Sequence, residues 1–343
     1  MKLYRAAGYC WHALNIKKMK KLILLIITTM ISLLFPKGVA AQQDAQLSQY
    51  VFNGIYVNPA YAGYREQLNV NAFYHNQWTG IKGAPQTLSL VVDAIANSGN
   101  VGLALQVSSD RIGAQRNTAA YANYAYRIRL KGDGSSRLAL GVGIGVVQLG
   151  IDGALLNPNI PEPDQPSGMQ HTVVPDARAG VYYSDNRFFA GFSVDNLIAQ
   201  YLDVDRFAFV PQPKPHYYLS AGLMLPLSAN IQVKPSFLLK DDRGGPTSLD
   251  LSTFLVLGER LWVGGSYRTG VKLYNKSYLL KDLTSRNSAA AAVQVFADQN
   301  FRIGYAYGFS VGSLKTNSGG THEISVGYFF DKKEIRMLSP RNF

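Results

Sequence analysis

The feature that most constrains this chain is a regular alternation of apolar with small or polar residues from about residue 68 to residue 330. The clearest segment is Arg137–Gln148, whose alternate positions hold Leu138, Leu140, Val142, Ile144 and Val146. Side chains of a β-strand point to opposite faces in turn, so this pattern predicts strands with one apolar face. Soluble sandwiches share this period but turn the apolar face inward, so the period alone does not give the direction of that face.

The lengths of the connections separate these two architectures. The pattern divides into fourteen segments, and the gaps after the even-numbered ones are tight: 95–99, 131–135, 185–187, 226–229, 258–260 and 297–299. The other gaps are mostly longer: 75–86, 109–118, 151–175, 197–214, 269–287 and 310–321, with 241–247 intermediate. Short periplasmic turns and longer extracellular loops are typical of outer-membrane barrels. The sequence therefore predicts an all-β, up-and-down antiparallel transmembrane β-barrel of about 14 strands.

The N-terminal residues have the composition of a cleaved signal peptide. Met19 and two lysines precede the apolar run 22–35, and Val39-Ala40-Ala41 resembles a cleavage site. The run is too short for a comfortable transmembrane helix, and Met19 is an alternative start of the chain. We therefore expect a signal peptide over residues 1–41, a periplasmic or lumenal segment over 42–67, the barrel over 68–330 and a tail over 331–343.

Charge and cysteine content narrow the possible functions. The net charge of +12 falls to +5 without residues 1–41, because that segment holds seven Lys or Arg residues and no acidic residue. The basic character is therefore no indication of nucleic-acid binding. The single cysteine, Cys10, lies in the same segment, so the mature chain is expected to have no disulfide or thiol chemistry.

Two stretches at the start of the predicted barrel carry a family pattern. The first reads QLSQYVFN at 46–53 and VNPAYAG at 57–63, and the second reads HNQWTGI at 75–81 and GAPQT at 83–87. Together with DRIG at 110–113 and HEISV at 322–326, they resemble the PorP/SprF family of outer-membrane proteins of the Bacteroidetes type IX secretion and gliding motility system. The tail 331–343 departs from that pattern, because such a barrel is expected to end on a terminal aromatic residue near Phe330.

The resemblance implies a partner-binding role. It suggests binding and handling, or surface anchoring, of a cargo protein with a C-terminal sorting domain, with contacts to other secretion components and the lipid bilayer. The alternative function is a passive or substrate-selective outer-membrane channel. The five histidines are scattered and no nucleophile elbow, P-loop or metal-ligand spacing occurs, so we expect no enzyme activity, cofactor or metal site.

The candidate partner-binding or lumen residues fall into three groups. They are Gln49, Tyr50, Asn53, Asn58, Pro59 and Tyr61 in the N-terminal segment, His75, Gln77 and Trp78 in the first long loop, and Arg127, Arg178, Arg302 and Glu323, which strand parity places in the lumen. The N-terminal segment is either a strap that fills the barrel or a periplasmic docking element. The charged residues form either a structural network, in which Arg302 and Glu323 could pair, or a cationic lining.

Three further expectations concern single residue types. His75 is interpreted as a satisfied rim histidine, and Trp78 as an interface anchor or lumen-packing residue. Asp203, Asp205, Asp241 and Asp242 are weak candidates for calcium ligands. Glycines on the predicted lumen face are expected to leave free space: Gly141, Gly143, Gly145, Gly180, Gly191, Gly222, Gly304 and Gly308.

Overall fold

The computed structural model describes residues 49–156, 168–198, 201, 213–258, 260–276, 287–311 and 319–330. All of them belong to one compact unit of residues 41–343. The expected signal peptide, Asp203, Asp205 and the C-terminal tail lie outside the described residues.

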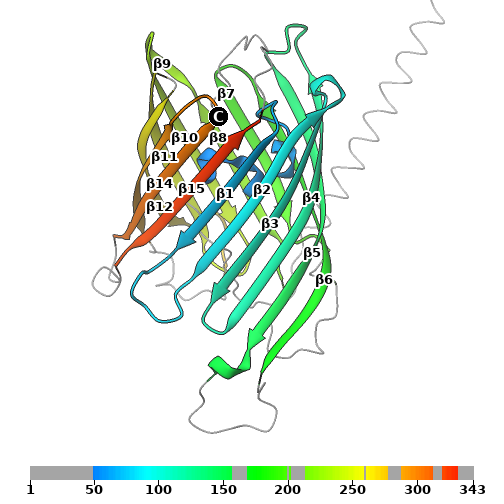
Figure 1. The fold of residues 1–343 in the computed structure, drawn as a ribbon, viewed down its shortest axis with the longest axis vertical. Coiled ribbons are helices and arrows are strands. Elements are labelled where there is room, and N and C mark those ends of the chain that lie inside the picture. The colour runs from blue at the N-terminus through cyan, green and yellow to red at the C-terminus, as the bar shows by residue number, and fades with distance from the viewer. Residues whose placement is uncertain are drawn as a thin grey trace, which may run out of the picture. The chain divides into compact units, whose positions relative to one another are not determined.

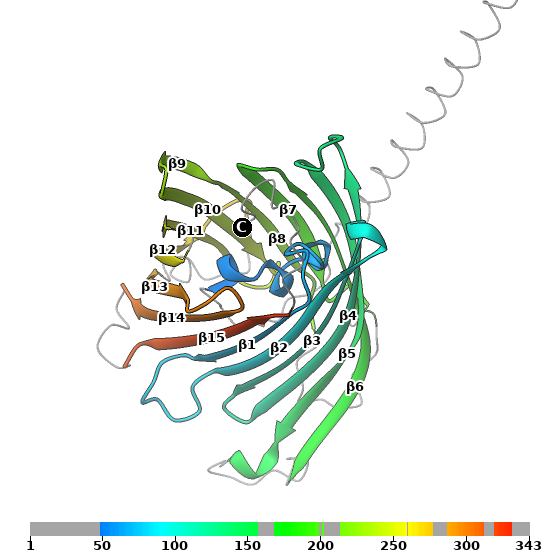
Figure 2. The same ribbon diagram turned by 45° about the horizontal axis from the view of Figure 1, so that its top comes forward.

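One antiparallel sheet closes on itself to form a barrel (Figures 1 and 2). Its strands are β1 (Asn69–Asn76), β2 (Gln86–Ala96), β3 (Val101–Ile112), β4 (Gln115–Arg129), β5 (Arg137–Asp152), β6 (Met169–Ser184), β7 (Phe188–Asp195), β8 (His216–Leu223), β9 (Leu225–Ser228), β10 (Ile231–Asp241), β11 (Thr247–Leu257), β12 (Leu261–Val271), β13 (Ser288–Phe296), β14 (Phe301–Ser310) and β15 (Thr321–Phe329). Strands β8 and β9 are separated by Met224 and both pair with β10, so they form one span. The fifteen strands therefore make the fourteen predicted spans, closed by pairing of β15 with β1.

The apolar face of the sheet points outward. On β5, Ile144 is 69% exposed and Val142 is 54% exposed, whereas the intervening Gly141 and Gly143 are buried. Such exposure of large apolar side chains would be unfavourable in water and is favourable in a bilayer. The sequence period did not show to which side the apolar face points, and the structure shows that it points outward, as in a membrane barrel. The predicted fold class is confirmed.

The connections follow the predicted alternation with one clear exception. The tight turn predicted at residues 185–187 is confirmed, but the long loop predicted at 109–118 is wrong. Strand β3 continues to Ile112 and β4 begins at Gln115, so a two-residue turn at Gly113 and Ala114 joins them. Backbone pairing continues here after the apolar alternation has ended, because ladder hydrogen bonds do not require a lipid-facing side chain. Strands β3–β6 are consequently long and extend the wall at the long-loop end (Figure 1).

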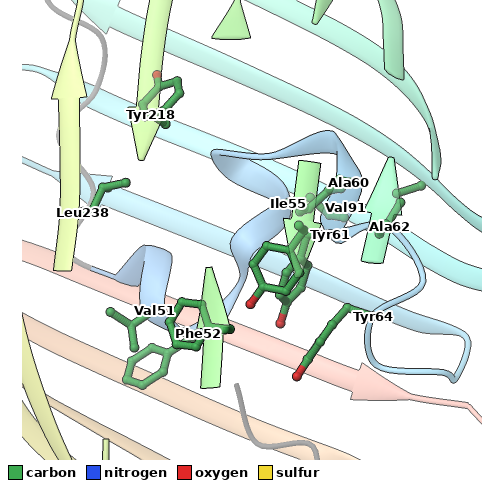
Figure 3. Close-up of a cluster of buried hydrophobic side chains, with 14 of the residues drawn as sticks. Val51, Phe52, Ile55, Ala60, Tyr61, Ala62, Tyr64, Val91, Tyr218 and Leu238 are labelled. Carbon is green, nitrogen blue, oxygen red and sulfur yellow. The ribbon is translucent and has the colours of Figure 1, made fainter. Parts of the chain in front are cut away.

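The helical content is confined to short 3-10 turns. Three of them, η1 (Gln49–Phe52), η2 (Gly54–Tyr56) and η3 (Pro59–Tyr61), precede β1, while η4 (Asn97–Gly99) and η5 (Gly153–Leu155) lie in connections. In the part of the chain that the structure describes, no helix is long and apolar enough to span a membrane. The buried apolar cluster lies inside the barrel, where η1–η3 meet the inner wall (Figure 3).

Candidate functional site: the plug in the barrel lumen

Residues 49–66, here called the plug, fold inside the barrel near its short-turn end (Figure 2). Its apolar side chains are buried against the wall. The ring of Phe52 meets Phe254 and Trp262 edge-on, with centroids 5.2 and 5.9 Å apart. Tyr61 packs against Tyr182 of β6, with ring centroids 5.5 Å apart. The plug is therefore an integral part of the barrel core.

Glycines on the wall allow the plug to lie in close contact with the barrel. A Cβ built on Gly102 would lie 1.9 Å from the carbonyl oxygen of Ala62, and one on Gly141 would lie 2.2 Å from the amide nitrogen of Ala60. A Cβ on Gly180 would lie 2.2 Å from Asn58 Oδ1. These are distances that real Cβ atoms do not adopt, so only glycine allows the plug backbone to come so close.

The expectation that lumenal glycines leave free space is therefore wrong for most of them. Besides the glycines under the plug, Gly143 lies against Arg178 and Asn123, Gly145 against Tyr121, and Gly222 against Phe189. At Gly308, by contrast, an added Cβ would meet its neighbours at ordinary contact distances. Glycine at these positions leaves room for large neighbouring side chains, so the inner wall is closely packed.

Asn53 and Asn58 organise the plug backbone. Each precedes a 3-10 turn and accepts a hydrogen bond from the backbone two residues later, Asn53 from Ile55 N at 3.5 Å and Asn58 from Ala60 N at 2.9 Å. Asn58 Nδ2 also donates to the carbonyl oxygens of Val181 at 3.0 Å and Phe192 at 3.4 Å. Asn58 therefore joins the plug to both β6 and β7.

Basic side chains hold the carbonyl groups of η1. Lys234 Nζ donates to the carbonyl oxygen of Val51 at 3.3 Å, and Arg302 Nη1 donates to that of Phe52 at 3.1 Å. Arg65, within the plug, donates to the same oxygen of Phe52. The last carbonyls of a helical turn have no partner within the turn, and here the wall supplies one. Arg302 also donates to Asn71 of β1, which ties this contact to the closing strand.

Two carboxylates fix the end of the plug that leads into β1. Asp93 of β2 accepts from the backbone nitrogen of Gly63 at 2.6 Å. Glu66, whose backbone has φ of 60°, accepts from Arg127 at 3.0 Å and also from Arg137. The plug is thus attached to the wall at its beginning, middle and end. Burial raises the pKa of Tyr56 to about 12, so this tyrosine of the plug is neutral.

Arg178 belongs to a separate network in the wall. Its guanidinium donates to Asn123 and Gln106, both at 2.8 Å, and lies 4.7 Å from the centre of the Tyr121 ring. Tyr121 in turn donates to Asp176 at 2.6 Å. Arg178 thus cross-links β3, β4 and β6, which supports the structural-network interpretation of the lumenal charges.

The predicted pairing of Arg302 with Glu323 is wrong. In the register of β14 with β15, Arg302 lies opposite Gly327 and Glu323 lies opposite Ala306, so the two residues are at different heights of the wall. Glu323 instead contacts His75 Nδ1 at 3.1 Å, and both side chains are 1% exposed. His75 is a residue of β1, not of the first loop. Its carboxylate partner was missed because it lies 248 residues away in sequence.

The remaining candidates divide between the plug and the first long loop. Gln49 and Tyr50 form the beginning of η1, and Pro59 is the first residue of η3. Gln77 and Trp78 lie in the 77–85 loop at the opposite end of the barrel, where Gln77 N bonds to the carbonyl oxygen of Pro85 at 2.9 Å. The structure does not bring this loop to the plug.

The extracellular acids are used in protein contacts. Asp241 accepts from Lys276 at 2.9 Å, and Asp242 accepts from the backbone nitrogens of Gly244 and Gly245 at 3.0 and 2.6 Å. Among the described residues, no group of three or more His, Cys, Asp or Glu side chains could hold a metal ion.

The sheet closure, the outward apolar face and the lumenal plug define an outer-membrane β-barrel. The chain belongs to the family described as type IX secretion system membrane protein PorP/SprF, whose sequence profile matches residues 39–328. The resemblance seen in the sequence motifs is thereby confirmed, as is the outer-membrane location. This family is not an enzyme family.

The chain is also similar to solved structures at low sequence identity. The CymD monoaromatic hydrocarbon channel is 12% identical, with 86% of this chain and 95% of that chain covered and a TM-score of 0.48. A FadL homologue of Pseudomonas aeruginosa is 10% identical, with 85% and 96% covered and a TM-score of 0.44. The KdgM porin is 9% identical, with 77% and 100% covered and a TM-score of 0.35. No protein of curated function matches the chain in sequence.

Proposed function

We propose that this protein binds and handles, or anchors at the cell surface, a cargo protein with a C-terminal sorting domain, as an outer-membrane component of type IX secretion. The observation that carries the proposal is the plug, which packs inside the lumen. Passive diffusion needs a continuous aqueous passage. Here Phe52 and Tyr61 pack against side chains of β6, β11 and β12, and the backbone at Ala60 lies against a wall glycine.

The two ends of the barrel offer different surfaces to partners. The long loops lie at the extracellular end, and the plug begins at η1 near the periplasmic end. An exported cargo would meet the long loops, including Gln77 and Trp78, whereas periplasmic secretion components would meet the short turns and the chain before η1. In this proposal the plug is chiefly a strap that fills the barrel, because Asn58, Lys234, Arg302 and Glu66 all hold it to the wall.

Affinity purification tests the proposal directly. The tagged full chain is purified from gently solubilised outer membranes, and co-purifying proteins are identified by mass spectrometry. We expect a large secreted protein with a C-terminal sorting domain, together with secretion components. An unrelated outer-membrane barrel with the same tag is the control. Recovery of the barrel alone, with ion conductance in a planar bilayer, would instead support the channel function.

A pair of variants locates the cargo surface. Replacing Gln77 and Trp78 with Ala changes the first long loop, and Lys131→Ala changes an exposed residue of a short turn at the other end. We expect the loop variant to recover less cargo while still recovering periplasmic components, and Lys131→Ala to behave like the wild type. The reverse pattern would place the cargo at the periplasmic end.

A further inference from the structure

A row of polar side chains crosses the outer face of the barrel at its extracellular rim. Asn76 of β1 lies opposite Gln86 of β2, Gln86 opposite Arg111 of β3, and Arg111 opposite Arg116 of β4. Strand parity places all four on the outward face, with the exposed apolar residues and not with the buried lumenal ones. We call these four residues the rim patch.

In the part of the chain that the structure describes, the two arginines of the rim patch have no ion-pair partner. Arg111 and Arg116 are exposed and directly opposite each other on adjacent strands, an arrangement that is unfavourable for like charges. Within the described ranges, neither guanidinium forms a hydrogen bond or an ion pair. The neighbouring Asp110 points to the other face, where it accepts from Thr87 Oγ1 at 2.5 Å. An external anion would remove the repulsion.

A small pocket adjoins Arg111. It has a volume of about 210 Å³ and is lined by Asn76, Gln86 and Arg111 together with residues of the 77–85 loop. The loop is held in place on both sides. Gly113 N bonds to the carbonyl oxygen of Gly83 at 2.8 Å, and Thr79 N bonds to that of Gly320 at 2.8 Å. The pocket is therefore part of the folded rim, and its lining is polar.

Below the rim patch, the same strands present the lipid-facing belt. Leu88 and Leu90 of β2 are 57% and 47% exposed, and Leu105 and Val107 of β3 are 61% and 48% exposed. Leu88 follows Gln86 by two residues, which is a rise of roughly 7 Å along a strand. Cationic and amide groups thus lie directly above an apolar surface, at the height expected for the headgroups of the outer leaflet.

We infer that the rim patch binds the phosphate groups of a phosphorylated glycolipid of the outer leaflet. Arg111 and Arg116 donate charge-assisted hydrogen bonds to the phosphate oxygens, for which the planar guanidinium is well suited. Asn76 and Gln86 offer donors and acceptors for sugar hydroxyls in the pocket. The acyl chains lie over Leu88, Leu105 and their neighbours. This inference is independent of the cargo, since it concerns the outer wall of the barrel.

Native mass spectrometry of the purified full chain in detergent tests the inference. The probes are diphosphorylated lipid A, the same lipid A without phosphates, and inorganic phosphate. The test variant is Arg111→Gln with Arg116→Gln. The control is Lys131→Gln with Arg187→Gln, which removes the same charge from exposed positions in the short turns. Folding of every variant is checked by heat-modifiable migration in gel electrophoresis.

We expect the test variant to bind diphosphorylated lipid A roughly tenfold or more weakly, since two charge-assisted contacts are lost. The control variant should bind like the wild type. Arg111→Lys with Arg116→Lys keeps the charge without the planar fork, and intermediate binding is expected. Equal binding of the phosphate-free lipid, unchanged binding by the test variant, or equally tight binding of inorganic phosphate would each overturn the inference.

Discussion

Single residues of the wall determine how closely the plug approaches the barrel. Gly141 lies under the backbone of Ala60, and Asn58 supplies both a cap for η3 and two donors to the wall. Neither residue bears a charge or a reactive group. Their contribution is geometric, because one permits the contact and the other satisfies the backbone groups that the contact buries.

Gly141→Val should therefore destabilise the barrel. The new side chain would overlap the backbone of Ala60, which cannot rotate away as a side chain could, and overpacking of this kind costs about 1–3 kcal/mol. Urea unfolding of the detergent-folded protein, followed by tryptophan fluorescence, measures the loss. Gly308→Val is the matched control, because an added Cβ there has ordinary contacts. Equal stability of the two variants would contradict the close contact between Gly141 and the plug.

Variants at Asn58 separate its two roles. Asn58→Asp keeps the acceptor for Ala60 N but removes both donors to Val181 and Phe192, whereas Asn58→Ala removes all three contacts. We expect both variants to unfold at lower urea concentration, with Asp at least as unfavourable as Ala because it faces two carbonyl oxygens in a buried site. Loss of an N-cap alone costs about 1 kcal/mol. Wild-type stability of Asn58→Asp would show that only the cap matters.

At the scale of elements, the plug and the wall stabilise each other. Turns as short as η1–η3 are not stable in isolation, and side chains of β10 and β14 satisfy the last carbonyl groups of η1. Side chains of β2 and β4 hold the end of the plug, at Gly63 and Glu66. The wall in turn contains buried cations whose partners are carbonyl oxygens of the plug. Removal of one element leaves the polar groups of the other without partners, and this is unfavourable in a packed lumen.

Deletion of residues 49–61 should convert the barrel into a conducting pore. The deletion removes Phe52 and Tyr61 and exposes Lys234 and Arg302 to water in the lumen. Single-channel recording in planar bilayers compares the deletion with the full chain, which we expect to conduct poorly. A folded deletion variant that also fails to conduct would show that other residues close the lumen. A variant that does not fold would show that the plug is needed for barrel formation.

At the scale of the whole molecule, closure of the barrel depends on the first and last strands. Strands β1 and β15 pair over Asn69–Asn76 and His322–Phe329. The contact between His75 and Glu323 crosses this seam in a fully buried position. Arg302 of β14 also reaches Asn71 of β1, so two polar contacts reinforce the backbone ladder at the seam.

Glu323→Ala should weaken this closure. It leaves the buried His75 without its acceptor, and an unsatisfied buried polar group costs about 1–3 kcal/mol. The temperature at which the folded band disappears in heat-modifiable gel electrophoresis measures the effect. Glu323→Gln retains an acceptor oxygen and is expected to lose less stability. If both variants melt like the wild type, the contact does not stabilise the seam.

The sequence alone determined the architecture and the sidedness of the barrel. Strand alternation is a local property, and turn-forming residues mark the short connections, so the fourteen spans and their two ends could be predicted. Parity also placed Arg127, Arg178, Arg302 and Glu323 in the lumen correctly. Asn58 and Tyr61 could also be identified from the sequence, because both stand in one contiguous family motif.

Only the tertiary structure decided which of these residues meet. The partner of Glu323 depends on the register of β14, β15 and β1, and a shift of a few residues along a strand separates Arg302 from it. Glu66 has no local signal that links it to Arg127 or Arg137. The contacts of Gly102, Gly141 and Gly180 depend on where the plug folds back against the wall. Such contacts join residues far apart in the chain, and they are fixed by closure and packing, which no local pattern encodes.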